Sequence, residues 1–315
     1  MTNRIILSYF ILLVAFSCTR PSDPFEPQID CVLQDQYLLQ LPSSAPPLSS
    51  EEAHETWSTE YRIAKGFAKE LDLYQTSVSC KRTLFLLPED RIQRKIELDY
   101  DILLCYYIAK RYDEATAFFE HSSLRTLDVT HPLTKDCLTI LFDSYTHTKN
   151  TLRADQLLLH MASLSQDDAK RLLLSRALEQ GDIPTLQMFS EQDSYIPVRT
   201  LLQDYDHYKK SSKTAQMLNA ILPGAGYLYL GQKQSAMTAF LLNGLFIGAA
   251  CYFFFHENIP AGIIFTSFEA GWYFGGITGA RQEANLYNER IYEMLASPMM
   301  NQEKLFPILS LRYAF

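Results

Sequence analysis

Catalytic signatures are missing from this chain of 315 residues. There is no Gly-x-x-x-x-Gly-Lys-Ser/Thr phosphate loop, no His-Glu-x-x-His zinc motif and no Gly-x-Ser-x-Gly nucleophile motif. The six cysteines include no Cys-x-x-Cys pair, and the seven histidines are scattered, so no local cluster of metal ligands can be named. We therefore expect a protein that is not an enzyme and that uses no metal or other cofactor.

A surplus of positive charge is missing as well. The chain has 28 lysines and arginines against 36 acidic residues, which gives a net charge of −8. Because a domain that binds nucleic acid usually carries a basic patch or stripe, we expect no nucleic-acid partner. The same acidic balance argues against broad electrostatic adhesion to anionic lipid.

Long apolar runs are present, and two of them lie close together. Residues 236–255 and 259–280 are separated only by the His-Glu-Asn sequence at 256–258. An α-helix needs about 20 apolar residues to cross a hydrocarbon core of about 30 Å, and each run has this length. The sequence therefore predicts a two-helix transmembrane hairpin within residues 217–280, with both of its ends on one side of the membrane.

A segment rich in proline and glycine precedes the first run, and it reads Leu-Pro-Gly-Ala-Gly-Tyr-Leu-Tyr-Leu-Gly at 222–231. Proline lacks an amide hydrogen, glycine accepts backbone angles that other residues resist, and tyrosines suit the headgroup layer. This Pro-Gly-x-Gly pattern with its tyrosines resembles the turn of TM2-like bacterial membrane domains over residues 218–285. The resemblance implies location in a membrane rather than an activity. The residues of the predicted hairpin turn are Pro223, Gly224, Gly226, Tyr227, Tyr229 and Gly231.

Glycines recur at every fourth position in both runs. Because residues four apart share one helix face, these glycines allow close helix packing in lipid. We expect the glycine faces to pack on each other or on a second copy of the protein. The residues are Gly244 and Gly248 in the first run and Gly271, Gly275 and Gly279 in the second.

One charged residue, Glu269, lies inside the runs, and Asn243 is the nearest polar candidate in the facing run. A carboxylate in lipid is costly, so Glu269 is expected to be protonated or paired and to face the hairpin interior. Two readings stay open for it, a structural hydrogen bond or a role in a proton or ion relay.

The N-terminus has the composition of an export signal. Arg4 precedes an apolar stretch at 5–16, the pattern of a secretory signal peptide. The Ala-Phe-Ser sequence before Cys18 resembles a bacterial lipoprotein box, although Phe16 departs from the small residue usual there. Residues 1–18 are thus either a lipoprotein signal with Cys18 as the lipidated residue or an ordinary signal peptide with an incidental cysteine. Residues 19–55 are rich in Pro, Ser, Asp and Glu and predict a disordered linker.

Helical periodicity with few prolines and glycines extends over residues 56–211. Aromatic and small residues around 106–119 resemble the packing positions of a tetratricopeptide repeat, and an equivalent set follows near 145–154. The resemblance implies an α-solenoid of about four helix–turn–helix units whose concave face holds a protein partner; an irregular helical bundle is the alternative. The repeat-packing residues are Tyr106, Tyr112, Ala115, Phe119, Tyr145 and Ala154.

Residues 281–315 predict an amphipathic helix that ends before Ser297-Pro298, followed by a short C-terminal strand. Leu309, Leu311, Tyr313 and Phe315 alternate with the period of a strand. This end resembles the targeting strand of outer-membrane barrels, but the chain has too few other strands to close a barrel. A tail strand or arm docked on a neighbour is therefore expected.

The parts together predict a mainly α protein with an export signal, a helical repeat domain and a membrane hairpin. This combination resembles envelope proteins of bacteria, chlamydial ones among them. We expect a membrane-anchored envelope scaffold that binds a protein partner, with the helical domain in the periplasm. The basic residues that flank the hairpin, Lys233 and Arg281, favour the opposite orientation under the positive-inside rule. The alternative function is a component of a transport or channel complex that uses the hairpin and Glu269.

Overall fold

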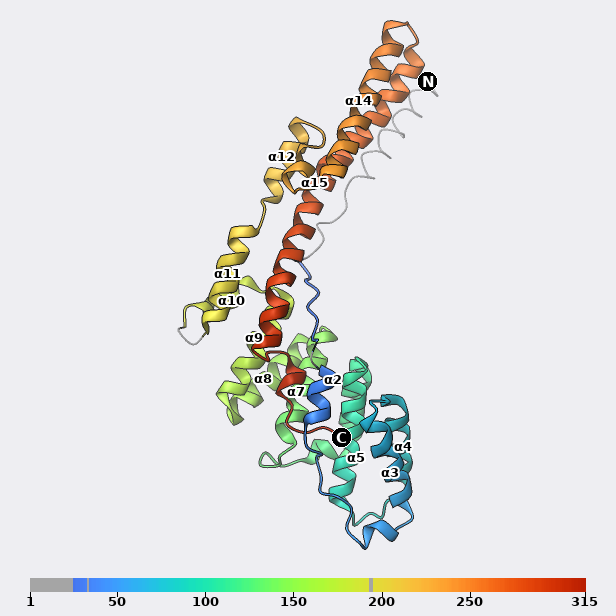
Figure 1. Ribbon diagram of the computed structural model, residues 1–315, viewed down its shortest axis with the longest axis vertical. Coiled ribbons are helices and arrows are strands. Elements are labelled where there is room, and N and C mark those ends of the chain that lie inside the picture. Colours follow the sequence, from blue (N-terminus) through green and yellow to red (C-terminus); the bar gives the residue numbers. More distant parts are fainter. Residues whose placement is uncertain (1–24, 33, 193–194) are drawn as a thin grey trace. The chain divides into compact units, whose positions relative to one another are not determined.

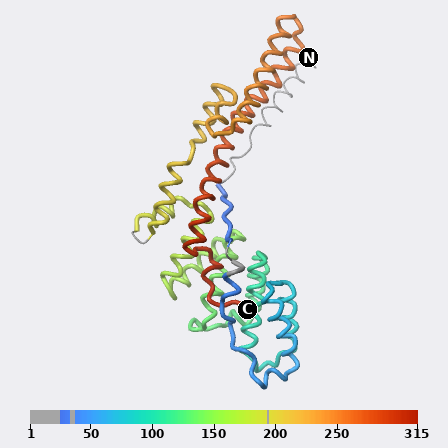
Figure 2. The backbone as a smooth tube through the Cα atoms, viewed as in Figure 1, coloured from blue at the N-terminus to red at the C-terminus, as the bar shows by residue number. Residues whose placement is uncertain are grey.

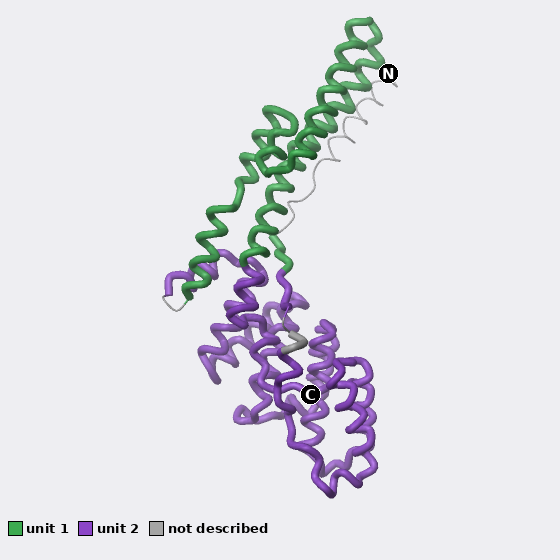
Figure 3. Tube along the Cα trace, in the orientation of Figure 1, with its two compact units in different colours: residues 1–28, 195–295 green, residues 29–194, 296–315 purple. Residues whose placement is uncertain are grey.

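The computed structural model describes residues 25–32, 34–192 and 195–315, and these residues are mainly α-helical with no β-strand among them. They form two compact units (Figure 3). Unit 1 contains residues 195–295 with the segment up to Gln28, and unit 2 contains 29–194 and 296–315. The predicted signal segment, Cys18 included, lies outside the described residues. The unit boundary at 194 differs from the predicted domain boundary at 211.

Unit 2 is built from helices that pack on their neighbours in chain order (Figure 1). Contacts also join the first helices of successive pairs, α5 with α7 and α7 with α9. The α-helices are α2 (Gln34–Gln40), α3 (Trp57–Lys69), α4 (Leu73–Leu86), α5 (Ile92–Ile108), α6 (Tyr112–His121), α7 (Thr134–His147), α8 (Thr151–Leu164), α9 (Gln166–Gln180) and α10 (Ile183–Ser190). The short 3-10 helices are η1 (Glu52–His54), η2 (Ser123–Thr126) and η4 (Pro307–Ser310).

The same turn closes four helix pairs of unit 2. A left-handed residue stands in each turn, and these residues, 39, 39 and 32 positions apart, are Leu71, Lys110, Lys149 and Gly181. In each case the next amide donates to the carbonyl five residues earlier, as Asn150 does to Tyr145 at 2.9 Å. The Asn150 side chain then accepts from the Arg153 amide and caps the following helix. Unit 2 therefore repeats one helix–turn–helix element four times.

Small residues sit where the two helices of a pair approach most closely. Ala115 and Ala154 are fully buried, as the alignment of the repeat predicts. Around Ala154, the cluster of Leu138, Phe142 and Met161 fills the space between α7 and α8. A second cluster surrounds Trp57 between α3, α4 and α5.

Two segments outside the helix pairs lie on unit 2. The described residues of 29–55 carry α2 and η1 and are held by protein contacts, since Arg94 donates to the carbonyls of Pro46 and Pro47. This segment differs from the disordered linker that its composition predicts, because buried hydrogen bonds fix it. The predicted tail strand is wrong: Pro307–Ser310 form η4, and a single bridge joins Ser43 to Ala314. The alternating apolar pattern marks burial here, with Leu309 and Leu311 inside.

Unit 1 begins with α11 (Ile196–Tyr208), α12 (Ser212–Ile221) and α13 (Ala225–Tyr229). The Pro-Gly segment connects α12 to α13, and Gly224 has a φ of 93°. A side chain at Gly226 would meet the Ala215 carbonyl oxygen at 2.3 Å, so this glycine is needed for close approach to α12 rather than for its backbone angles.

The chain then continues into α14 (Lys233–Phe255) and α15 (Ile259–Gln302). Within unit 1 they run side by side (Figure 2) and pack through rings, with Phe253 and Phe265 stacked at 5.3 Å. Among the described helices, α14 is the one long and apolar enough to cross a membrane. The predicted second span is only the start of the 44-residue α15. The predicted helix end before Ser297 is also wrong, because α15 continues through Pro298.

Candidate functional site

Polar side chains form a ladder along the first helices of the pairs in unit 2. Tyr61 donates to Glu97 at 2.7 Å, and Lys65 pairs with Glu97 at 2.8 Å and Asp101 at 2.7 Å. The partners stand 36 residues apart in the Tyr61–Glu97 and Lys65–Asp101 contacts, as they do in Tyr100–Asp136 and Tyr107–Asp143. The ladder thus repeats with the helix pairs, and most of its carboxylates are buried.

Arg94 is the most enclosed cation of the ladder. Its guanidinium makes two bonds to the Glu52 carboxylate, at 3.0 and 2.9 Å, and one to Glu97 at 2.9 Å. This fork lowers the pKa of Glu52 to about 2, chiefly through the hydrogen bonds from Arg94. Nothing in the local sequence around Glu52 indicates a partner 42 residues away.

Asp136 on α7 holds the C-terminal tail. Its Oδ2 accepts the amides of Arg312 at 2.9 Å and Tyr313 at 3.1 Å, and the hydroxyl of Tyr100 at 3.3 Å. Burial raises the pKa of Asp136, against the opposing effect of these donors. The tail is therefore bound as an extended peptide through its backbone.

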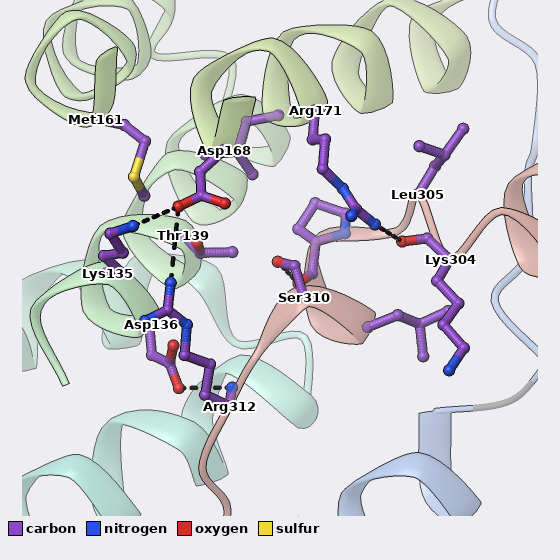
Figure 4. A pocket seen from close by; sticks show the side chains of 13 residues that line it. Lys135, Asp136, Thr139, Met161, Asp168, Arg171, Lys304, Leu305, Ser310 and Arg312 are labelled. Carbon is purple, nitrogen blue, oxygen red and sulfur yellow. Dashed lines mark hydrogen bonds and ion pairs between the residues drawn. The ribbon is translucent and has the colours of Figure 1, made fainter. Parts of the chain in front are cut away.

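A cavity of about 260 Å³ opens beside this contact, between α7, α9 and the tail. Figure 4 shows Lys135 and Arg312 directed at Asp168, while Arg171 reaches the Lys304 carbonyl. Because Asp168 pairs with both Lys135 and Arg312, the positive charge of the cavity lining is partly balanced by a residue of the lining itself. Residues of the tail form one wall of this cavity.

A cluster of three titratable side chains, Asp143, His147 and Glu179, lies near the C-terminal end of α7. Asp143 and His147 are one turn apart, Glu179 comes from α9, and one ligand atom from each lies within 4.8 Å of the other two. Tyr107 donates to Asp143 Oδ2 at 2.6 Å, and the Tyr112 ring stacks on His147 at 4.4 Å. The sequence missed this trio because Glu179 is remote in the chain; the available signal was the Asp143-x-x-x-His147 spacing on an expected helix.

The trio is arranged to hold protons near neutral pH. Burial and the charge of Asp143 raise the pKa of Glu179 to about 8. Burial lowers the pKa of His147, but the hydrogen bond and charge of Asp143 outweigh it and raise that pKa to about 9. At pH 7 the trio therefore contains a charged imidazolium on His147 and a neutral Glu179.

This arrangement predicts that stability falls as pH rises from 6.5 to 8. Stability from His147 is complete below its unfolded pKa of about 6.5 and is lost toward its folded value, while the cost of ionising Glu179 grows over the same range. We expect a lower urea midpoint at pH 8 than at pH 6.5, and a smaller difference in His147→Gln. An equal decline in His147→Gln would show that the trio is not responsible.

The predicted repeat residues lie at contacts between the helices of unit 2. Tyr106 contacts Phe118 with ring centroids 5.9 Å apart, Tyr145 packs against the Ala154 cluster, and Phe119 is half-buried. Tyr112 has a further contact that the repeat pattern does not predict, the stacking on His147.

The predicted membrane residues are only partly brought together. No hydrogen bond joins Asn243 to Glu269 in the described structure; Asn243 Nδ2 donates to the Ala239 carbonyl at 2.6 Å. Asn243 Oδ1 and Glu269 Oε2 are both buried without a hydrogen-bond partner. Nothing lies within 4 Å of a side chain built at Gly244, Gly248, Gly271 or Gly275, so these glycine faces do not pack on each other; Gly279 meets the Tyr227 hydroxyl.

The tyrosines of the predicted turn are half-buried. The Tyr229 hydroxyl accepts the Ser211 amide, and Lys210 lies over the Tyr229 ring at 5.3 Å. Gly231 adopts a φ of 85° after α13, and Pro223 lines a cavity with Asn243.

Comparison with family models, curated proteins and solved structures finds no match for this chain.

Proposed function

We propose that this protein is a membrane-anchored scaffold of the bacterial cell envelope that holds a protein partner through its helical array. The exposure of α14 carries the proposal. Only 17% of its most apolar window is buried within the chain, and large side chains such as Phe240, Leu245 and Phe255 are exposed. A helix of a soluble core would bury these residues, whereas lipid accepts them on every face.

The first part of α15 is proposed as the second half of a transmembrane hairpin. It packs on α14 through Phe265 and Phe268, whose rings contact Phe246, and it exposes Ile263 and Ile264. The Pro-Gly turn would lie at the membrane entrance. The export signal places the helical array in the periplasm in this proposal, although Lys233 and Arg281 favour the reverse.

The array is proposed to be tetratricopeptide-like and to bind an extended segment of a partner. Support comes from the four repeated turns and from the tail, since α7 already binds an extended peptide through the carboxylate of Asp136. The open space at Gly244, Gly248, Gly271 and Gly275 supports a second copy of the protein as a further partner within the membrane.

Vesicle flotation tests the anchor. The full chain, diluted from detergent into phosphatidylcholine vesicles, is expected to float with them in 1 M salt and at alkaline carbonate pH, because burial of α14 does not depend on charge. Release by either treatment would contradict the anchor. In cells, trypsin access at Lys209 and Lys213 after opening the outer membrane, but before lysis, is expected; cleavage only after lysis would place the array in the cytoplasm.

A second candidate function is a component of a transport or channel complex. The unsatisfied Asn243 and Glu269 oxygens favour it, together with a cavity of about 560 Å³ that Asn243 lines. Glu269→Gln separates the two functions: only the transport role should lose activity with folding intact. Glu257→Gln, in the connection between α14 and α15, is the control.

A further inference from the structure

We propose that Asp143, His147 and Glu179 bind a divalent transition-metal ion between α7 and α9. Their ligand atoms come from two contacting helices and converge within 4.8 Å of one another. Ligand atoms bound to a tetrahedral metal at about 2.0–2.2 Å stand about 3.3–3.6 Å apart, so the trio needs to close by up to about 1.5 Å. His147, whose side chain is 40% exposed, has the freedom to close and leaves an entry path.

The surroundings of the trio match the outer shell of a metal site. His147 Nδ1 lies 3.0 Å from the Asp143 carbonyl oxygen, and a proton donated there leaves Nε2 free as a ligand. Tyr107 fixes the Asp143 carboxylate from the other side. Such partners orient metal ligands and raise their basicity.

An independent feature points into the same site. Ser175 stands one turn before Glu179 on α9 and is fully buried; its hydroxyl has no hydrogen-bond partner at normal distance and interacts only more weakly with the Glu179 carboxyl. Neither Asp143 nor Glu179 forms an ion pair with a lysine or arginine within the described chain; the cation beside Asp143 is His147, whose Nδ1 lies 3.3 Å from Asp143 Oδ1. A cation and its bound water would satisfy both the carboxylates and the serine.

The donor set selects the class of ion. One imidazole nitrogen with two carboxylates suits Zn²⁺ or Mn²⁺, whereas Mg²⁺ and Ca²⁺ prefer oxygen ligands alone. Three protein ligands leave a coordination position open to water. The site does not depend on membrane anchoring, because all three ligands belong to unit 2.

The test is a titration of the chelator-treated full chain in detergent with ZnCl₂. Calorimetry is expected to give one ion per chain and thermal unfolding a higher Tm, which chelator reverses and which Mg²⁺ at equal concentration does not reproduce. His147→Gln and Glu179→Gln are each expected to weaken binding at least tenfold.

His121→Gln is the matched control. His121 lies in the last turn of α6 with its Nδ1 3.0 Å from the Ala117 carbonyl oxygen, but it has no carboxylate cluster. Zinc affinity should be unchanged in this variant. The proposal is overturned if no ion binds, if affinity survives His147→Gln in a chain of normal helicity, or if His121→Gln loses affinity equally. Tyr107→Phe provides a second variant that keeps all ligands, with an expected loss of about 10-fold or more.

Discussion

Arg94→Met is expected to lower the free energy of unfolding of unit 2 by about 3–5 kcal/mol. The Arg94 side chain is 6% exposed and donates five hydrogen bonds under 3.2 Å, to Glu52, Glu97 and two proline carbonyls. Removing the Arg94 guanidinium leaves the Glu52 carboxylate buried without its paired cation. The cost arises from the carboxylate left behind more than from the net value of the pair.

Urea unfolding measures this effect. Trp57 is fully buried within unit 2, and Trp272→Phe removes the other of the two tryptophans from the signal. Arg82→Met is the control, because the Arg82–Glu60 pair has an arginine 65% exposed and should contribute at most about 1 kcal/mol. A loss below 1 kcal/mol in Arg94→Met would contradict the structural account. Adding Glu52→Gln to Arg94→Met should restore part of the stability.

Leu245→Arg is expected to weaken membrane association of the full chain by about 10²-fold. Leu245 lies near the middle of α14 and is 64% exposed, so arginine fits the folded chain without displacing a neighbour. An arginine at the centre of a spanning helix costs about 2.5–3.5 kcal/mol, which gives the expected factor. The measurement is the fraction that floats with vesicles over a series of lipid concentrations.

Leu152→Arg is the matched control for this experiment. Leu152 is an equally exposed leucine on α8 of unit 2, at 69% exposure. It should leave flotation unchanged. Equal flotation of Leu245→Arg and the unchanged chain would mean that α14 does not enter the hydrocarbon core.

The sequence could predict those features that depend on neighbouring residues. Helical periodicity, the turn before α14 and the small residues Ala115 and Ala154 all follow from local spacing. The turns are 39, 39 and 32 residues apart because the helices of successive pairs differ in length. The alternation of apolar residues from Leu309 to Phe315 led to the wrong prediction of a strand. The same alternation of buried and exposed side chains arises in an extended arm bound to a helix.

The polar interior could not be predicted in this way. The Arg94–Glu52 fork, the Asp136 contact with the tail and the approach of Glu179 to Asp143 and His147 join residues 32 to 177 positions apart. No local pattern encodes such pairs, since each carboxylate in the sequence resembles an ordinary solvated one. Only the repeat, which places equivalent helices side by side, gives an indirect signal for the 36-residue pairs.

The tail contact also fixes an order of events during synthesis. Residues 312–313 complete the hydrogen bonds of Asp136, yet they are translated after α14 and α15. Helix pairs α3 to α10 can pack as they are made, but the Asp136 carboxylate then lacks the hydrogen bonds from the amides of Arg312 and Tyr313. The contact between α7 and the tail therefore forms only after α14 and α15 have been made. Closing this contact over 176 residues sets a late step in folding, governed by chain entropy rather than by helix formation.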